Sequence, residues 1–169
     1  IGTFTATGIM IAASAGLSQW LLGNGVVFDG VSYGWLGAFA CVVTGLIAGS
    51  LIGLITEYFT SGSQRPTRKV VESCQTGAAT NVIGGLALGM ESTAVPILLM
   101  IASILISHHF MGLYGIALAA LGMLSTTGIQ LAVDAYGPIA DNAGGIAEMG
   151  GLGSSVRDRT DRLDAVGNT

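Results

Sequence analysis

Acidic and amide side chains are concentrated in one short stretch next to a nearly uncharged part of the chain. Residues 141–149 read Asp-Asn-Ala-Gly-Gly-Ile-Ala-Glu-Met. Asp141, Asn142 and Glu148 offer the hard oxygen ligands that Mg²⁺ prefers, and no His or Cys lies nearby to favour a softer metal. The glycines at 144–145 would let the backbone pass close to an oxyanion. These residue types predict a magnesium site for a phosphate-bearing ligand; the alternative is a solvated helix end made of good turn formers.

Two further polar positions belong to the same candidate site. Asp134 precedes the motif, and the pair Gly137-Pro138 is expected to interrupt the helix between Asp134 and Asp141, because proline has no N–H to donate to the helix. The backbone freed there would need protein or water partners rather than lipid. Asn168 lies where a new helix is expected to begin, so its amide would either cap that helix or reach a metal-bound phosphate. The residue types alone favour the cap.

Residues 157–164 alternate arginine with polar and acidic residues, as on the solvated face of a helix. Asp158 and Arg162 stand in the acid-first i,i+4 order, which stabilises a helix by roughly a few tenths of a kcal/mol per pair. This segment is therefore interpreted as a salt-bridged surface.

The elements that position these residues are expected to lie in a membrane. The chain has six basic and ten acidic residues among 169, together with 27 glycines. This composition fits a membrane protein far better than a soluble domain, and no basic stripe indicates nucleic-acid binding. Cys41 and Cys74 are distant in sequence from each other and from the histidines, so they predict neither a disulfide framework nor a zinc site.

The uncharged runs predict an all-α fold, a polytopic bundle of transmembrane helices. A span needs about 20 apolar residues. Four spans are expected near residues 1–22, 34–57, 92–111 and 113–137. Another helix over 70–89 is expected at the membrane interface, with Ser92 or Thr93 capping the next helix and Pro96 in its first turn. The alternative is one long helix kinked at Pro96.

Small residues and basic clusters indicate how these helices are arranged. The last span carries small residues that permit close helix contact, namely Gly115, Ala117, Ala119, Ala120 and Gly122. All basic residues fall within 65–69 and 157–162, and two expected spans separate the clusters, so both are expected on one face, the cytoplasmic one. Cytoplasmic loops are accordingly expected near 58–72 and 141–165.

Motifs along nearly the whole chain resemble those of one family. They are Thr56-Glu-Tyr-Phe-Thr-Ser, Ser73-Cys-Gln-Thr-Gly-Ala-Ala-Thr-Asn-Val-Ile, Gly85-Leu-Ala-Leu-Gly, Leu113-Tyr-Gly-Ile-Ala, Ala120-Leu-Gly-Met-Leu-Ser-Thr and the block from Asp134 to Thr169. They resemble the membrane-bound, ion-translocating inorganic pyrophosphatases, in the family's order. Because the chain opens on Ile1 without an initiator methionine or a leader pattern, we expect an internal fragment of such a protein.

The resemblance implies a reaction and a set of site residues. It implies hydrolysis of inorganic pyrophosphate to phosphate, coupled to pumping of H⁺ or Na⁺ across a membrane, by a homodimer whose subunits have roughly sixteen helices. It makes Asp141 a ligand to the Mg²⁺ ions that hold pyrophosphate and places Asn168 in the same metal and substrate cluster. Asp134 and Glu148 take supporting roles, and K⁺ is a candidate activator.

The resemblance also places the rest of the machinery elsewhere. The acid- and lysine-rich motifs that supply most ligands, the water-activating aspartates and the ion gate lie in other helices of the family. We therefore assign no catalytic residue within this fragment and expect it to be inactive alone. A second hypothesis is a secondary transporter or channel, in which Asp134 and Asp141 bind a coupling ion at a broken helix without hydrolysis. Composition fits both hypotheses, whereas the motif pair of Asp141 and Asn168 favours the pyrophosphatase.

Overall fold

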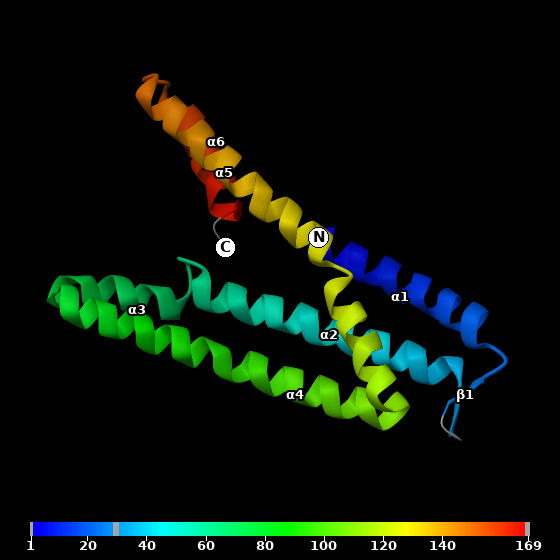
Figure 1. Ribbon diagram of the computed structural model, residues 1–169. Coiled ribbons are helices and arrows are strands. Elements are labelled where there is room, and N and C mark those ends of the chain that lie inside the picture. The colour runs from blue at the N-terminus through cyan, green and yellow to red at the C-terminus, as the bar shows by residue number, and fades with distance from the viewer. Residues whose placement is uncertain (1, 29–30, 168–169) are drawn as a thin grey trace. The chain divides into compact units, whose positions relative to one another are not determined.

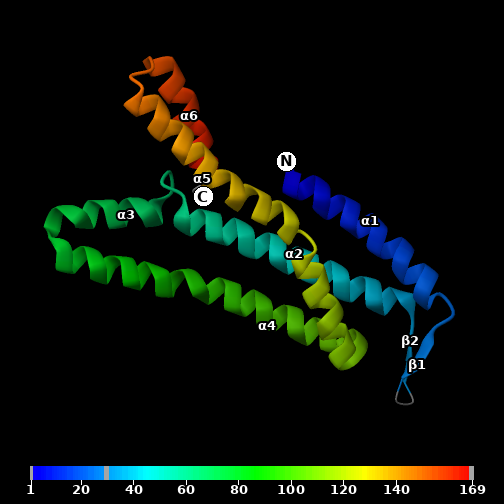
Figure 2. The same ribbon diagram turned by 45° about the horizontal axis from the view of Figure 1, so that its top comes forward.

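A computed structural model describes residues 2–28 and 31–167 (Figures 1 and 2). In chain order the elements are α1 (Gly2–Leu22), β1 (Val26–Phe28), β2 (Val31–Tyr33), α2 (Trp35–Thr60), α3 (Arg65–Ser73), a 3-10 turn (Cys74–Thr76), α4 (Ala78–Leu124), α5 (Thr127–Met149) and α6 (Ser154–Gly167). They form two compact units, residues 1–126 and 127–169. The predicted helical class is confirmed, with one addition: β1 and β2 pair as a short antiparallel hairpin.

In the first unit, α2 packs closely against α4. Both views show the two helices side by side, with the last part of α4 crossing α2 (Figures 1 and 2). A Cβ on Gly45 would collide with the carbonyl oxygen of Ala119, and a Cβ on Gly122 would collide with that of Val42. The small residues Gly115, Ala119 and Gly122 are buried in this contact, which confirms them as positions of close helix approach.

Two helix boundaries were predicted within α4: the one between the spans 92–111 and 113–137 is confirmed, and the one near 89–92 is absent. The backbone is helical through Gly89–Pro96 and leaves helical geometry only at Met111 and Gly112, where φ of Gly112 is +58°. Ser92 and Thr93 do not cap a new helix, because their hydroxyls donate to carbonyls three residues earlier, Gly89 at 2.8 Å and Met90 at 2.8 Å. The predicted boundary near 89–92 is therefore wrong, and the alternative of one helix continuing through Pro96 describes the chain better.

The segments expected as loops at 58–72 and 141–165 are largely helical. Helix α2 continues to Thr60, and α3 begins at Arg65 after a short turn, with Pro66 at a position where its missing N–H is tolerated. The second segment holds the end of α5 and most of α6, joined by a short turn. Helices continue here because polar residues on a solvated helix face need no loop to reach water.

The second unit is a helical hairpin of α5 and α6, and α5 runs unbroken through Gly137-Pro138. The predicted interruption between Asp134 and Asp141 is thus wrong. Proline at 138 removes one donor, the one that would otherwise reach the carbonyl of Asp134, and a helix can continue past that single loss.

Large apolar side chains are exposed in both units. Trp20 is 79% exposed, Leu113 80% and Met149 84%. Within the described residues, Trp35–Thr76 and Ala78–Met149 contain helices long and apolar enough to cross a membrane, and most of their residues are not buried. The core helix of a soluble protein would bury such side chains, so their exposure fits helices that face lipid or further helices.

Candidate functional site

Helix α5 places three predicted site residues along one side. Asp134, Asp141 and Glu148 follow one another at seven-residue intervals, which is close to two full turns, so their side chains project in nearly the same direction. Neighbouring members are about 10 Å apart along the axis. Because Mg²⁺ binds oxygens at about 2 Å, two neighbouring acids of this row are too far apart to bind the same ion. An ion bound to any one of them would need further ligands from elsewhere.

Helix α6 runs antiparallel beside α5 (Figures 1 and 2). It packs against the side of α5 that carries small residues. Ala140 and Ala147 are buried there, and a Cβ on Gly144 would lie 3.8 Å from the side chain of Thr160. Gly137 lies against Gly167 at the other end of the contact. Because α6 runs antiparallel to α5, and Gly144 lies opposite Thr160, Asp141 and Asp164 lie at about the same level of the hairpin.

The turn between the helices is closed by backbone hydrogen bonds. The N–H of Leu152 donates to the carbonyl of Ala147 at 3.0 Å, and that of Gly151 donates to Glu148 at 3.1 Å. Gly151 has φ +62°, a left-handed conformation that glycine adopts without strain. This is a Schellman motif, which ends α5 and sends the chain back along it.

An ion pair reinforces the hairpin beside this turn. Nη1 of Arg157 donates to Oε2 of Glu148 at 2.6 Å, and its Nε lies 3.5 Å from Oδ1 of Asp161. The hydrogen bond to Glu148, with smaller help from the charge of Asp161, raises the pKa of the Arg157 guanidinium above its ordinary value. Within the described part of the chain, the expected pair of Asp158 with Arg162 does not form, and Arg157 pairs with Glu148 and Asp161 instead. Glu148 thus closes the hairpin rather than standing free for a cation.

Asp141 and Asn142 present exposed side chains with no hydrogen bond or ion pair to the described residues. A carboxylate without a protein partner keeps its oxygens available to a cation. Asp134, also exposed, is free in the same sense. The donors that fit a magnesium ion are thus Asp141 first, with Asn142 beside it, and Asp134 farther along the helix.

Two polar groups that the sequence did not single out are buried in this unit. Oδ1 of Asp164 and the hydroxyl of Tyr136 have no partner among the described residues. The residue pattern had assigned Asp164 to a solvated charge ladder. Asp164 lies seven residues after Arg157 and four after Thr160, and both of these lie on the contact face of α6. This helical spacing could have placed Asp164 in the interface.

The structure does not support an oxyanion loop at 144–145. Both glycines lie inside α5, where the backbone N–H groups of a helix are engaged within it. Asn168 lies outside the described residues, so its predicted role stays a prediction. Among the residues described, no group of three or more His, Cys, Asp or Glu is arranged to hold a metal ion.

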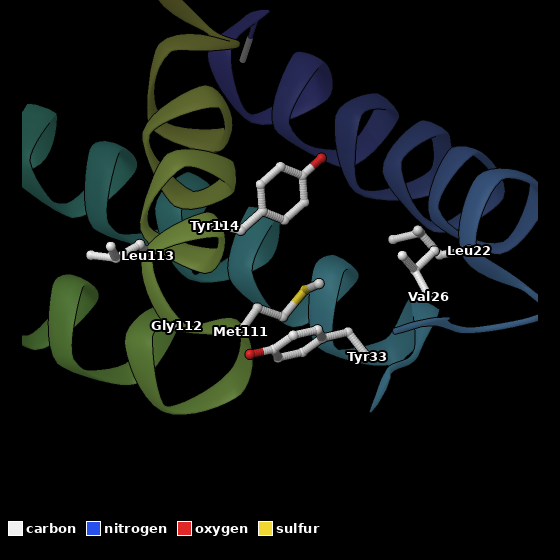
Figure 3. A pocket seen from close by; sticks show the side chains of 7 residues that line it. All are labelled: Leu22, Val26, Tyr33, Met111, Gly112, Leu113 and Tyr114. Carbon is white, nitrogen blue, oxygen red and sulfur yellow. The ribbon is translucent and has the colours of Figure 1, made fainter. Parts of the chain in front are cut away.

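A pocket of about 490 Å³ lies in the first unit, between the start of the β hairpin and the break in α4. Figure 3 shows Met111 and Tyr33 side by side, with Tyr114 nearby and Leu113 directed away from them. The pocket is lined by Leu22, Val26, Tyr33, Met111, Gly112, Leu113 and Tyr114. Without a carboxylate or a basic group, this pocket does not suit a magnesium-bound phosphate.

Long apolar helices that expose large side chains, followed in the chain by a helical hairpin with exposed acids, are features of a polytopic helical membrane protein. Comparison with known sequences specifies this class further. Residues 1–169 match the family described as inorganic H⁺ pyrophosphatase. The chain belongs to this family.

Similar proteins include pumps of two kinds. A putative K⁺-stimulated pyrophosphate-energized sodium pump of Bacteroides thetaiotaomicron is 53% identical over 171 residues, covering 95% of this chain and 22% of the relative. One of the same description from Clostridium tetani is 49% identical, covering 99% of this chain and 24% of the relative. A K⁺-insensitive pyrophosphate-energized proton pump of Methanosarcina mazei is 50% identical over 139 residues, 78% of this chain and 21% of the relative. The chain thus spans less than a quarter of the length of these relatives.

Proposed function

We propose that this chain is part of a pump that hydrolyses inorganic pyrophosphate to phosphate and uses the released energy to move H⁺ or Na⁺ across a membrane. Family membership supports this proposal, as do relatives whose names describe pyrophosphate-energized sodium and proton pumps. Those relatives are K⁺-stimulated sodium pumps and K⁺-insensitive proton pumps, so K⁺ is a candidate activator here. A homodimer of the full-length protein is part of the proposal.

Within this protein, the α5–α6 hairpin supplies part of a Mg²⁺-pyrophosphate site. One observation carries this assignment: the carboxylate of Asp141 is exposed and has no ion-pair partner among the described residues, whereas Glu148 on the same helix is paired with Arg157. Asp141 holds magnesium, Asn168 joins the same cluster, and Asp134 supports it from two turns away. Glu148 contributes indirectly, because its ion pair holds α6 against α5.

The chain's own residues account for binding and orientation. Bound Mg²⁺ would neutralise phosphate charge and stabilise the leaving oxygen. Asp141 is suited to hold such an ion because its oxygens have no competing protein donor, and a rigid helix keeps them at a constant place. The residues that activate water and gate the ion path belong to parts of the full-length protein beyond this segment, and hydrolysis needs them.

A secondary transporter or channel is the competing class. It would use Asp134 and Asp141 to bind a coupling ion at a broken helix, but α5 is continuous between them. The experiment that separates the two uses sealed vesicles containing the full-length protein, with pyrophosphate and Mg²⁺ added outside. The proposal expects phosphate release together with uptake of H⁺ or Na⁺ that stops when pyrophosphate is consumed. Ion movement driven only by a gradient, without phosphate release, would contradict it.

A further inference from the structure

We infer that the backbone contact between Gly137 and Gly167 positions the metal-binding end of the α5–α6 hairpin. The inference rests on the proposed function and adds two positioning residues to it. Neither glycine has a side chain with which to bind magnesium or phosphate. Each would act through the residues on either side of it in the sequence.

The contact leaves no room for a side chain. A Cβ on Gly137 would lie 3.2 Å from the carbonyl oxygen of Gly167, and a Cβ on Gly167 would collide with Cα of Gly137 and lie 3.1 Å from its nitrogen. The atoms in the way belong to the backbone. A flexible side chain can rotate away from an added methyl group, whereas a helix backbone has to shift as a whole.

Other glycines of the same hairpin are not constrained in this way. A Cβ on Gly128 would meet nothing within 4 Å, and one on Gly144 would make an ordinary contact of 3.8 Å with Thr160. The close approach is thus confined to one crossing point. It lies at the opposite end of the interface from the Arg157–Glu148 ion pair, so α6 is held at both ends.

The sequence places this crossing point among the proposed ligands. Gly137 is three residues after Asp134 and four before Asp141, so it lies within about one turn of each. On α6, Gly167 is joined directly to Asn168. A shift at the crossing point would therefore move the proposed ligands Asp134 and Asp141 of α5 relative to α6. A misplacement of about 1 Å in a catalytic arrangement can cost on the order of a hundredfold in rate.

The test uses the full-length protein with three alanine substitutions. Gly167→Ala and Gly137→Ala add a methyl group at the crossing point, and Gly128→Ala adds the same group to α5 where space is open. Pyrophosphate hydrolysis is measured against free Mg²⁺ and against pyrophosphate, per amount of folded protein in the membrane. We expect Gly167→Ala to raise the Mg²⁺ concentration for half-maximal rate and to lower kcat/KM by about tenfold to a hundredfold. Gly137→Ala, whose added methyl group meets a less severe contact, should shift the Mg²⁺ concentration for half-maximal rate and kcat/KM in the same directions by less than about tenfold. Gly128→Ala should match wild type in both.

The outcomes separate this inference from the proposed function. A wild-type protein that releases no phosphate from pyrophosphate would overturn the proposed function itself. An active wild type, with crossing-point variants that keep its Mg²⁺ curve and kcat/KM per folded molecule, would overturn the positioning role, even if those variants accumulate poorly. Should Gly167→Ala not fold at all, the milder Gly137→Ala decides the question by the same two measurements.

Discussion

Replacing Gly112 by alanine should destabilise the folded protein through backbone strain alone. Gly112 has φ +58° and ψ −144° at the break in α4, a conformation that costs a residue with a Cβ about 1–3 kcal/mol. Space is not the limit, since an added Cβ would lie 3.7 Å from the hydroxyl of Tyr33, an ordinary contact. The expected effect therefore does not depend on which further helices surround this site.

Gly89 offers a matched control in the same helix. It is helical, and a Cβ there would meet nothing within 4 Å. Alanine in place of an unstrained helical glycine stabilises by roughly 0.5–1 kcal/mol. The two substitutions should therefore differ by about 1.5–4 kcal/mol, although both add one methyl group.

The assay is thermal unfolding of the purified full-length protein in detergent, with the rate of irreversible inactivation as a second readout. Gly112→Ala should unfold below wild type and Gly89→Ala at or above it. If Gly112→Ala unfolds at or above the temperature of Gly89→Ala, α4 does not require the glycine conformation at this point. The helix would then continue through 111–112.

Three further predictions follow from the hairpin and the topology. Glu148→Gln removes the negative charge that pairs with Arg157, so it should loosen the hairpin and speed amide hydrogen exchange in α6. Unchanged exchange would show that the ion pair does not stabilise the hairpin. Single cysteines that replace Gln64 and Ser154 should react with a membrane-impermeant label added on the cytoplasmic side, and a single cysteine that replaces Val27 should react with label added on the other side. Labelling of the first two positions from opposite sides would contradict the two membrane spans expected between them. Asn168→Asp keeps a good helix cap but adds negative charge, so it should change the Mg²⁺ dependence of hydrolysis and lower turnover at equal thermal stability, whereas superimposable curves would leave Asn168 as an ordinary cap.

The sequence predicted where helices form better than where they end. Long uncharged runs indicate helices regardless of tertiary context, and α1, α2 and α4 lie where such runs occur. Pro96 was expected in the first turn of a new helix and Pro138 at an interruption, yet α4 passes Pro96 and α5 passes Pro138, because one missing donor does not end a helix that is otherwise intact. The break at Met111–Gly112 falls where the spans 92–111 and 113–137 were expected to meet, but the positive φ of Gly112 was not predicted.

The candidate site was predictable in its residue types and only partly in its geometry. The carboxylate of Asp141 is exposed, and its role as a magnesium ligand stays a prediction. Glu148 belongs to the same motif, but its pairing with Arg157 depends on the hairpin turn, which brings together residues nine positions apart. The half-buried position of Asp164, whose Oδ1 atom is buried, was missed because a run of alternating charges is typical of a solvated helix until the partner helix that covers one side of it is known.

Pyrophosphate hydrolysis by full-length Asp141→Asn, compared with wild type at saturating Mg²⁺, tests the central claim most directly. The substitution removes the charge of a metal ligand and keeps nearly the same shape, so expression and membrane insertion serve as controls. Our account predicts that hydrolysis is abolished in a protein that still inserts normally. Hydrolysis within about threefold of wild type would show that Asp141 is an ordinary helix residue and that the hairpin does not hold the Mg²⁺-pyrophosphate complex.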